Sequence, residues 1–450
     1  MANKTDAVAA AADRPATIRQ ELGTAFRFFL SELKPKGKLL TPFNLITAPI
    51  IVVGLVLIVI RFAFGLASVT NLSQAYPWGI WIGFDVVTGV AFAGGAYILT
   101  FVVHILKLKK YEPIVRVTVL NGLLAYVFYA GALLLDLGRP WNVVNPIIGN
   151  AFGLSSVLFL VAWHFMLYMI TEFLEFSPAI AEWLRWKKVA RILSGLTTGA
   201  VIFGITLSTL HQSGLGAMFL TAASKIHPLW YSHNIPVLFF VSSVFAGLSM
   251  VMIEGFFTQK AFKHRIGHEL HANHDSITLG LAKGAVGALF AYFFLKLIDF
   301  VHYQQWTRMG DGYGAWYLFE NIGFVLVPAV LFIQAIRKRS VKLVQFTAFL
   351  TALGVCLNRL NISVIAFKVN EPVRYYPSWM EIVVTLAIIS MELWVFRWVI
   401  NRMPVLAEAP EVAAEKAAAA DAQVVQWKAS SAEPAPSQKA APANVPAGPV

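Results

Sequence analysis

Side chains that gain and lose protons lie inside long apolar segments of this 450-residue sequence. From the loop-rich surface inward, they are expected at three depths: Asp85, Asp136 and His211, then His164, then Glu172, Glu175 and Glu254. A charge near the centre of a bilayer costs roughly 2.5–3.5 kcal/mol on insertion scales, so such residues are candidates for function. Titratable groups at successive depths are the arrangement that a proton path requires.

Ion pairing is the alternative for several of these residues. Arg139 lies three residues after Asp136 and could form a salt bridge with it. In the second half, Lys296 and Asp299 lie three apart on one helical face, where they can pair directly. Acidic and basic residues occur there in similar number, which favours mutual neutralisation over a second site. The set comprises Lys296, Asp299, Glu320, Arg359 and Glu381.

Metal and haem ligands are not predicted. A b-type haem needs two imidazoles at matched depth on different helices, and only His211 and His302 share an expected depth. Four histidines with spacings of four, three and three could place three imidazoles on one face for a metal, but their basic loop favours a solvated surface: His264, His268, His271 and His274. The single cysteine, Cys356, excludes an iron–sulfur cluster held by this chain's own thiolates.

The elements that position these residues are transmembrane helices. The sequence is 58 % hydrophobic and 13 % charged, with a mean hydropathy of +0.65, whereas a soluble domain has about a quarter charged residues. This excludes a soluble enzyme, a disordered protein and a nucleic-acid binder. An all-α integral membrane protein is predicted, with ten blocks of at least about 20 apolar residues: 44–66, 79–106, 115–137, 153–175, 187–212, 235–258, 276–302, 313–336, 341–364 and 378–402.

Lysine and arginine predict the orientation of these spans. Seven precede Thr41, and clusters follow spans 2, 4, 6 and 8, so both termini are expected in the cytoplasm. The net charge of +12 is then a topology signal rather than a site for a polyanion. Three parts are predicted: a cytoplasmic segment 1–43 with an interfacial amphipathic helix on the lipid, a transmembrane domain 44–403, and a disordered Ala/Pro-rich cytoplasmic tail 404–450.

The outward loops are long and rich in Trp, Tyr, Pro and Gly, and cover residues 73–81, 137–150, 212–234 and 369–379. They predict a docking surface above a pocket mouth. The alternative is an aromatic belt at the membrane interface.

Several segments resemble the NrfD-like (polysulfide reductase membrane-subunit) family, and within it the HybB-type subunits of respiratory hydrogenases. These segments are Pro77-Trp-Gly-Ile-Trp-Ile-Gly-Phe-Asp85, Asp136-Leu-Gly-Arg-Pro-Trp-Asn142, Leu174-Glu-Phe-Ser-Pro178, Thr209-Leu-His-Gln-Ser-Gly-Leu-Gly216, Lys225-Ile-His-Pro-Leu-Trp230, Ile253-Glu-Gly255 and Tyr376-Pro-Ser-Trp379. Together they extend from about residue 40 to residue 403. One departure is Leu160, where HybB-type sequences carry an acid, although His164 follows one turn later.

The resemblance implies a quinone-reactive subunit without a redox centre of its own: no haem and no iron–sulfur cluster. Such a subunit binds menaquinone or ubiquinone near the periplasmic face of the bacterial inner membrane. The implied partners are a periplasmic ferredoxin-like iron–sulfur subunit and the large and small subunits of an [NiFe]-hydrogenase. A molybdopterin oxidoreductase of the formate dehydrogenase or polysulfide reductase type is an alternative catalytic partner, and a proton-coupled secondary transporter is the alternative from another class.

The motifs and shared depths together predict where the reaction occurs. The headgroup is expected near Asp85, Asp136, Arg139 and His211, with Trp81 and Gln212 also contacting the quinone. Protons are expected to enter from the cytoplasm through four further residues: His164, Glu172, Glu175 and Glu254. Quinone reduction consumes two protons with two electrons, so its site needs proton donors beside an apolar slot.

Overall fold

The computed structural model describes residues 18–35, 38–148, 153, 155–266 and 268–406. Within them, ten helices are long and apolar enough to cross a membrane, which confirms the predicted number. These spans are Pro42–Phe64, Trp81–Ile105, Lys109–Asp136, Val157–Trp183, Lys187–Leu220, Ile235–Ala261, Leu270–His302, Gly312–Arg337, Val341–Ile365 and Trp379–Ile400. No strand is formed in the described residues, whose single β-bridge joins Ile226 and Phe367.

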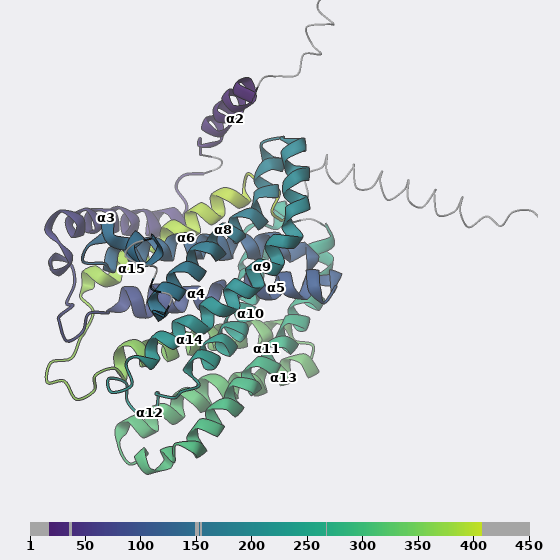
Figure 1. The fold of residues 1–450 in the computed structure, drawn as a ribbon. Helices are drawn as coiled ribbons and strands as arrows, with labels where there is room; N and C mark the ends of the chain where they lie inside the picture. The colour runs from purple at the N-terminus through teal and green to yellow at the C-terminus, as the bar shows by residue number, and fades with distance from the viewer. Residues whose placement is uncertain (1–17, 36–37, 149–152, 154, 267, 407–450) are drawn as a thin grey trace, which may run out of the picture. The chain divides into compact units, whose positions relative to one another are not determined.

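The helices carry the labels of Figure 1. Span 2 contains α4 and α5 between two π-helical segments, and span 8 contains α12 and α13 around a third. The bounds are α3 Pro42–Phe64, α4 Val87–Ala93, α5 Gly95–Thr100, α6 Glu112–Asp136, α8 Val157–Trp183, α9 Lys187–Leu220, α10 Ile235–Ala261, α11 His268–His302, α12 Gly312–Asn321, α13 Val327–Arg337, α14 Val341–Leu360 and α15 Trp379–Ile400.

Hydroxyl side chains begin several of these helices. The side chains of Thr41, Ser156 and Ser340 accept hydrogen bonds from the backbone N–H of the third residue of α3, α8 and α14. Ser378 and Glu381 form a reciprocal capping box at the start of α15. The hydrophobic blocks predicted the helices, but α9 continues eight residues beyond its expected end at 212, to about 51 Å in length.

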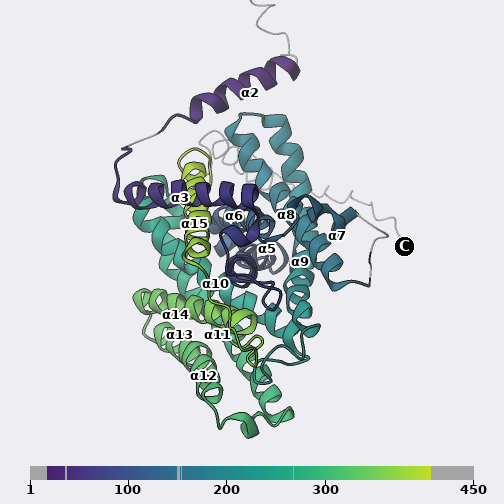
Figure 2. The same cartoon turned by 90° about the vertical axis from the view of Figure 1, so that its left-hand side faces the viewer.

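The spanning helices form two groups of four and a flanking pair. Span 2, α6, α8 and α9 pack together as the first bundle, and α10, α11, α12–α13 and α14 form the second bundle. The flanking pair, α3 and α15, packs against the first bundle through α6 and lies far from α12 and α13 in both views (Figures 1 and 2). The last helix in the sequence therefore borders the first bundle.

The two bundles touch where glycines remove side chains from both surfaces. A Cβ added at Gly247 of α10 would overlap the backbone of Gly94 and Gly95 in span 2. Small residues of this kind allow membrane helices to approach closely. This contact fixes α10 against the first bundle.

Two surfaces are defined by the connections between spans. The loop side carries residues 65–80, 137–148, 153, 155–156, 221–234, 303–311 and 366–378, and the basic side carries 106–108, 184–186, 262–266, 268–269 and 338–340. The sequence predicts that the basic side is cytoplasmic.

A separate helix, α2, covers Ile18–Glu32. Phe28 packs on Trp183 at 5.2 Å between ring centroids, and Glu32 forms a salt bridge with Arg402. The predicted position of α2 on the membrane surface remains a prediction. Residues 407–450 of the predicted tail lie outside the described residues.

Candidate functional site

Asp85 lies at the loop-side end of span 2, in the π-helical segment Trp81–Val86. Its side chain is buried; one carboxyl oxygen accepts a hydrogen bond from the Thr385 hydroxyl at 2.9 Å, and the other has no partner. Thr385 belongs to α15, and the Trp81 indole also donates to this helix, at the Glu381 backbone oxygen. Because π-helical turns are frequent at functional sites, a buried acid with a free oxygen is well placed to exchange a proton with a ligand.

Asp136 ends α6 on the same side and is also buried, with one carboxyl oxygen unpartnered. The alternative of a salt bridge to Arg139 is wrong: Arg139 is exposed, and no such pair exists in the described part of the chain. The neighbouring cation is Arg61 of α3, which donates to the backbone oxygens of Leu135 and Leu137 and acts electrostatically on Asp136. Sequence reasoning did not single out Arg61, whose partner Asp136 lies 75 residues away on another helix.

Glu381 ties two loops to α15. Its carboxylate accepts hydrogen bonds from the backbone N–H of Asn71 at 3.1 Å and of Ser378 at 2.8 Å, and from the Tyr375 hydroxyl at 2.5 Å. Burial raises the pKa of the Tyr375 phenol, and its bond to Glu381 raises it further, so Tyr375 stays a hydrogen-bond donor. Three donors give Glu381 a structural role at the loop-side end of the first bundle.

His211 lies deeper than these acids. It stands nine residues before Leu220, the last residue of α9, which corresponds to about 14 Å along the helix. Its ring is buried against Tyr126 of α6 and Phe165 of α8, with ring centroids 5.7 and 5.3 Å away. Both neighbours also lie well inside their helices.

The hydrogen bond of Gln212, the next residue, places His211 at the same depth. Its side-chain amide donates to the backbone oxygen of Val90 at 2.8 Å, and Val90 lies about 8 Å further along span 2 than Asp85. The structure therefore brings Asp85 and Asp136 to one end of the first bundle and places His211 about two turns deeper. The predicted roles of all three stay predictions.

Buried polar atoms without hydrogen-bond partners surround His211. The His211 cluster consists of Tyr126, His164, Tyr168, Glu172, Ser208 and His211. Seven of its side-chain atoms are unpartnered: the Tyr126 hydroxyl, His164 Nδ1, both Glu172 oxygens, the Ser208 hydroxyl and both His211 nitrogens. Tyr126 faces Ser208, and Tyr168 faces Glu172, outside direct hydrogen-bond geometry. Because buried polar atoms almost always have partners, we expect water molecules to bridge this cluster.

Glycines make room for two of the predicted proton-path acids. A Cβ at Gly122 of α6 would overlap the carboxylate of Glu172, and a Cβ at Gly204 of α9 would lie 2.9 Å from Glu175 Oε1. Together with His164, which acts electrostatically on His211, Glu172 and Glu175 line the interior of the first bundle toward the basic side.

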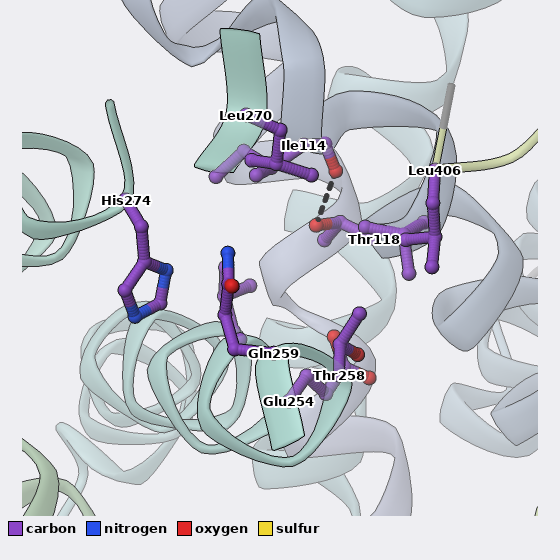
Figure 3. A pocket seen from close by; sticks show the side chains of 11 residues that line it. Ile114, Thr118, Glu254, Thr258, Gln259, Leu270, His274 and Leu406 are labelled. Atoms are coloured by element: carbon purple, nitrogen blue, oxygen red, sulfur yellow. Dashed lines mark hydrogen bonds between the residues drawn. The ribbon is translucent and has the colours of Figure 1, made fainter. Parts of the chain in front are cut away.

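Glu254 occupies a different place, at the junction of the two bundles. It is buried on α10, and neither of its carboxyl oxygens has a hydrogen-bond partner. It lines a cavity of about 30 Å³ near the basic side, together with Thr258, Gln259 and His274 (Figure 3). The predicted proton-path residues therefore fall into two groups rather than one line.

The acids and bases of the second bundle are held by neutral partners. Glu320 accepts hydrogen bonds from the Trp230 indole at 2.6 Å and from the side-chain amides of Asn358 at 2.6 Å and Asn361 at 2.5 Å. Asn358 also accepts from Arg359 at 2.9 Å, so one amide links an acid to a base. This network satisfies the Glu320 carboxylate with neutral donors, so the expected neutralisation by an opposite charge is not how Glu320 is held.

The predicted pairing of Lys296 with Asp299 is wrong. Asp299 accepts from the Asn234 side chain at 2.7 Å, and the Lys296 ammonium lies 4.9 Å from the ring centroid of Tyr317. No salt bridge joins the two within the described residues, because loop 221–234 supplies the partner of Asp299 instead.

On the loop side, His227 connects three loops. Its backbone N–H donates to the Ala366 oxygen at 2.8 Å, its ring stacks on Tyr313 at 4.8 Å, and Nε2 lies 3.9 Å from Asp311. Partial burial lowers the pKa of His227, against the opposing effect of the Asp311 carboxylate. His227 is therefore mainly neutral at pH 7.

Comparisons with known proteins agree with this architecture. The family profile described as polysulphide reductase, NrfD, matches residues 68–369. A protein of Nitratidesulfovibrio vulgaris is 42 % identical over 375 residues, which cover 83 % of this chain and 96 % of that protein. The probable Ni/Fe-hydrogenase 2 b-type cytochrome subunit of Escherichia coli is 30 % identical over 374 residues, covering 82 % and 94 %. The integral membrane subunit of menaquinone reductase of N. vulgaris is 24 % identical over 344 residues, covering 69 % and 77 %.

The word cytochrome in one relative's name raises the question of a haem. His211 is enclosed by aromatic rings, His302 is exposed at the loop-side end of α11, and His104 lies near the basic side. These three histidines do not face one another at matched depth, so no two of them fit a haem with two axial imidazoles.

A metal site is not formed by the histidine-rich loop as far as it is described. His271 pairs with Gln259 at 3.1 Å, and no group of three metal-ligating side chains occurs among the described residues. The side chains of His264 and His268 lie outside them.

Proposed function

Given that the chain belongs to the NrfD family, we propose that it is the quinone-reactive subunit of a respiratory hydrogen:quinone oxidoreductase in the bacterial inner membrane. Its partners are a periplasmic ferredoxin-like iron–sulfur subunit and the two subunits of an [NiFe]-hydrogenase. The hydrogenase relative supports this partner, and the menaquinone reductase relative supports the quinone. The loop side faces the periplasm and docks the partner, while both termini are cytoplasmic.

The observation that carries the proposal is Asp85, a buried acid with a free oxygen at the loop-side end of the first bundle. Electrons delivered from a periplasmic partner must reach the quinone from this side. The headgroup binds near Asp85, with Asp136 and Trp81 beside it and Arg139 at the mouth. His211 and Gln212, about two turns deeper, contact the inner side of the bound quinone or supply protons to it.

The chain contributes binding and proton transfer and has no redox centre of its own. Bound quinone is the electron acceptor, and the iron–sulfur subunit holds the electron donor. Protons come from the cytoplasm through two groups of side chains. The first is His164 with Glu172 and Glu175, and the second begins at Glu254. Since Glu172 and Glu254 are buried without ion-pair partners in the described chain, proton transfer accounts for their presence better than stability does.

The test uses the complex purified through an affinity tag on this chain. The parent reduces a quinone analogue with hydrogen, and its hydrogenase module also reduces an artificial dye. We expect His211→Ala and Asp85→Asn each to lower quinone reduction at least tenfold while dye reduction stays unchanged. His302→Ala, which alters an exposed histidine of the second bundle, is the matched control and leaves both activities unchanged.

Normal quinone turnover in both variants refutes the site. Copurification of a molybdopterin subunit in place of a hydrogenase refutes the partner, and the absence of any redox subunit favours the transporter alternative. The same preparation is expected to show no haem α-band in a reduced-minus-oxidised spectrum, and a band that tracks this subunit refutes the haem-free proposal.

A further inference from the structure

The helix α15 presents a line of polar groups to the first bundle. Thr385 bonds Asp85, and Glu392 follows it by seven residues, which is two turns on the same face and about 10 Å closer to the basic side. Glu392 acts electrostatically on both Asp85 and Glu254. In depth it lies between the two, since Asp85, Glu392 and Glu254 stand four, thirteen and nineteen residues from the loop-side ends of their helices.

Tyr129 of α6 fills the interval between Glu392 and Asp85. Its hydroxyl lies beside the Glu392 carboxyl, and it also interacts electrostatically with Asp85. A Cβ at Gly89, one turn inward from Asp85, would overlap the Tyr129 ring, so this glycine makes the room that the ring occupies. Side chains lean toward the N-terminus of their helix. Tyr129 and Glu392 lie on antiparallel helices, so they lean toward each other.

The cavity beside Glu254 supplies the other end of the line. Its volume of about 30 Å³ has room for two or three water molecules, since each needs roughly 10–15 Å³ of such space. Thr258, Gln259 and His274 line the cavity with polar groups (Figure 3). At the surface, His271 Nδ1 donates to the side-chain oxygen of Gln259 at 3.1 Å. The two unpartnered oxygens of Glu254 add to the polar lining of this cavity on the basic side.

We propose that Glu392 carries protons from Glu254 to Asp85. This rests on the proposed function, which it deepens by assigning the path from the cavity to α15 and Tyr129 instead of to His164. Each transfer moves one proton from a carboxylic acid to a carboxylate. Tyr129 accepts a proton on its oxygen while it gives up its own, and it stays neutral. The electrons reach the quinone separately, from the partner module.

A structural role does not explain Glu392. Within the described residues it has no salt-bridge partner, and the nearby Arg397 side chain donates to Asn44 instead. A carboxyl at this depth without a cation is costly. Glu392 lies on the same face of α15 as Thr385, which bonds Asp85, and this position gives it a function in proton transfer.

The experiment compares Glu392→Gln and Tyr129→Phe in the purified complex reconstituted in proteoliposomes. We expect each to lower hydrogen-driven quinone reduction at least tenfold, since proton transfer by a positioned group contributes about 10²–10⁴-fold. Dye reduction stays unchanged. The solvent deuterium isotope effect rises in both variants because proton delivery becomes rate-limiting, and Glu392→Asp restores part of the rate. Glu112→Gln, an exposed acid on the basic side of α6, is the matched control.

The outcomes separate this inference from the proposed function. A parent complex that reduces quinone, with normal rates and isotope effects in Glu392→Gln and Tyr129→Phe, overturns the α15 path alone. Slow turnover in Glu392→Gln with an unchanged isotope effect and no recovery in Glu392→Asp also overturns it, because that pattern indicates damage to packing. A parent complex that does not reduce quinone overturns the proposed function.

Discussion

An imposed membrane potential, negative on the basic side, should oppose quinone reduction by this subunit, because each quinone reduced is expected to move two charges across the membrane. Asp85 lies four residues, or about 6 Å, below the loop-side end of span 2. In a core of about 30 Å, an electron from the loop side crosses about one-fifth of the membrane, and a proton from the basic side crosses the other four-fifths. Each electron and proton pair therefore moves one charge across the membrane, and each quinone moves two.

The size of the effect follows directly. One charge moved against 100 mV costs about 2.3 kcal/mol, so two cost about 4.6 kcal/mol. Since 1.36 kcal/mol corresponds to a factor of ten, a potential of 100 mV, negative on the basic side, lowers the equilibrium ratio of quinol to quinone by roughly three orders of magnitude. Protons taken from the loop side would travel with the electrons, the net charge moved would be zero, and the ratio would not change.

The assay uses proteoliposomes with the partner module facing outward, hydrogen at fixed pressure, and a potassium gradient with valinomycin to set the potential. The ratio of quinol to quinone is measured at equilibrium with and without the potential. Glu254→Gln should approach equilibrium more slowly than Glu112→Gln, while both end at the ratio of the parent. A ratio that is independent of potential refutes uptake from the basic side and leaves Glu254 without a role in turnover.

Two further predictions concern stability and pH. Gly247→Ala should lower the free energy of unfolding by about 1–3 kcal/mol through overpacking against span 2. Gly287→Ala, where a Cβ meets nothing within 4 Å, should raise it by about 0.5–1 kcal/mol. Thermal unfolding in detergent compares the two variants, and equal shifts contradict the close contact of Gly247 with span 2. Burial lowers the pKa of His227 in the folded state. The contribution of neutral His227 to the free energy of unfolding is therefore complete above its unfolded pKa near 6.5, and it is lost as the pH falls toward its folded pKa. The melting temperature should therefore fall from pH 7 to pH 5 by more in the parent than in His227→Gln, and identical slopes refute this.

The sequence was sufficient for the helices because each span is encoded locally. A run of about 20 apolar residues must form a helix in lipid, where every backbone polar group needs an internal partner. The depth of each side chain in the membrane followed less directly, because it was counted from the expected ends of the helices. The helix α9 continues to Leu220 instead of ending near 212, so His211 lies well inside it.

Contacts between distant parts of the chain could not be read from the sequence. Thr385 lies 300 residues from Asp85, and the position of Arg61 near Asp136 depends on α3 packing beside α6. One signal was present and went unused. Glu381, Thr385 and Glu392 recur at spacings of four and seven, which places them on one face of a single helix.

That polar face shows what the last helix contributes to the first bundle. Two four-helix bundles pack against each other through α10, and a further flank of the first bundle is formed by α6 and the start of span 2, where α15 packs. Through α15 the chain covers that flank with Glu381 at the loop-side end, Thr385 on Asp85 and Glu392 below them. A helix needed only to exclude lipid would present apolar residues at these positions, since a carboxyl inside the membrane is costly. In the proposed path, Glu392 of α15 therefore belongs with Asp85 of span 2 and Glu254 of α10, so the path draws on the beginning, middle and end of the sequence.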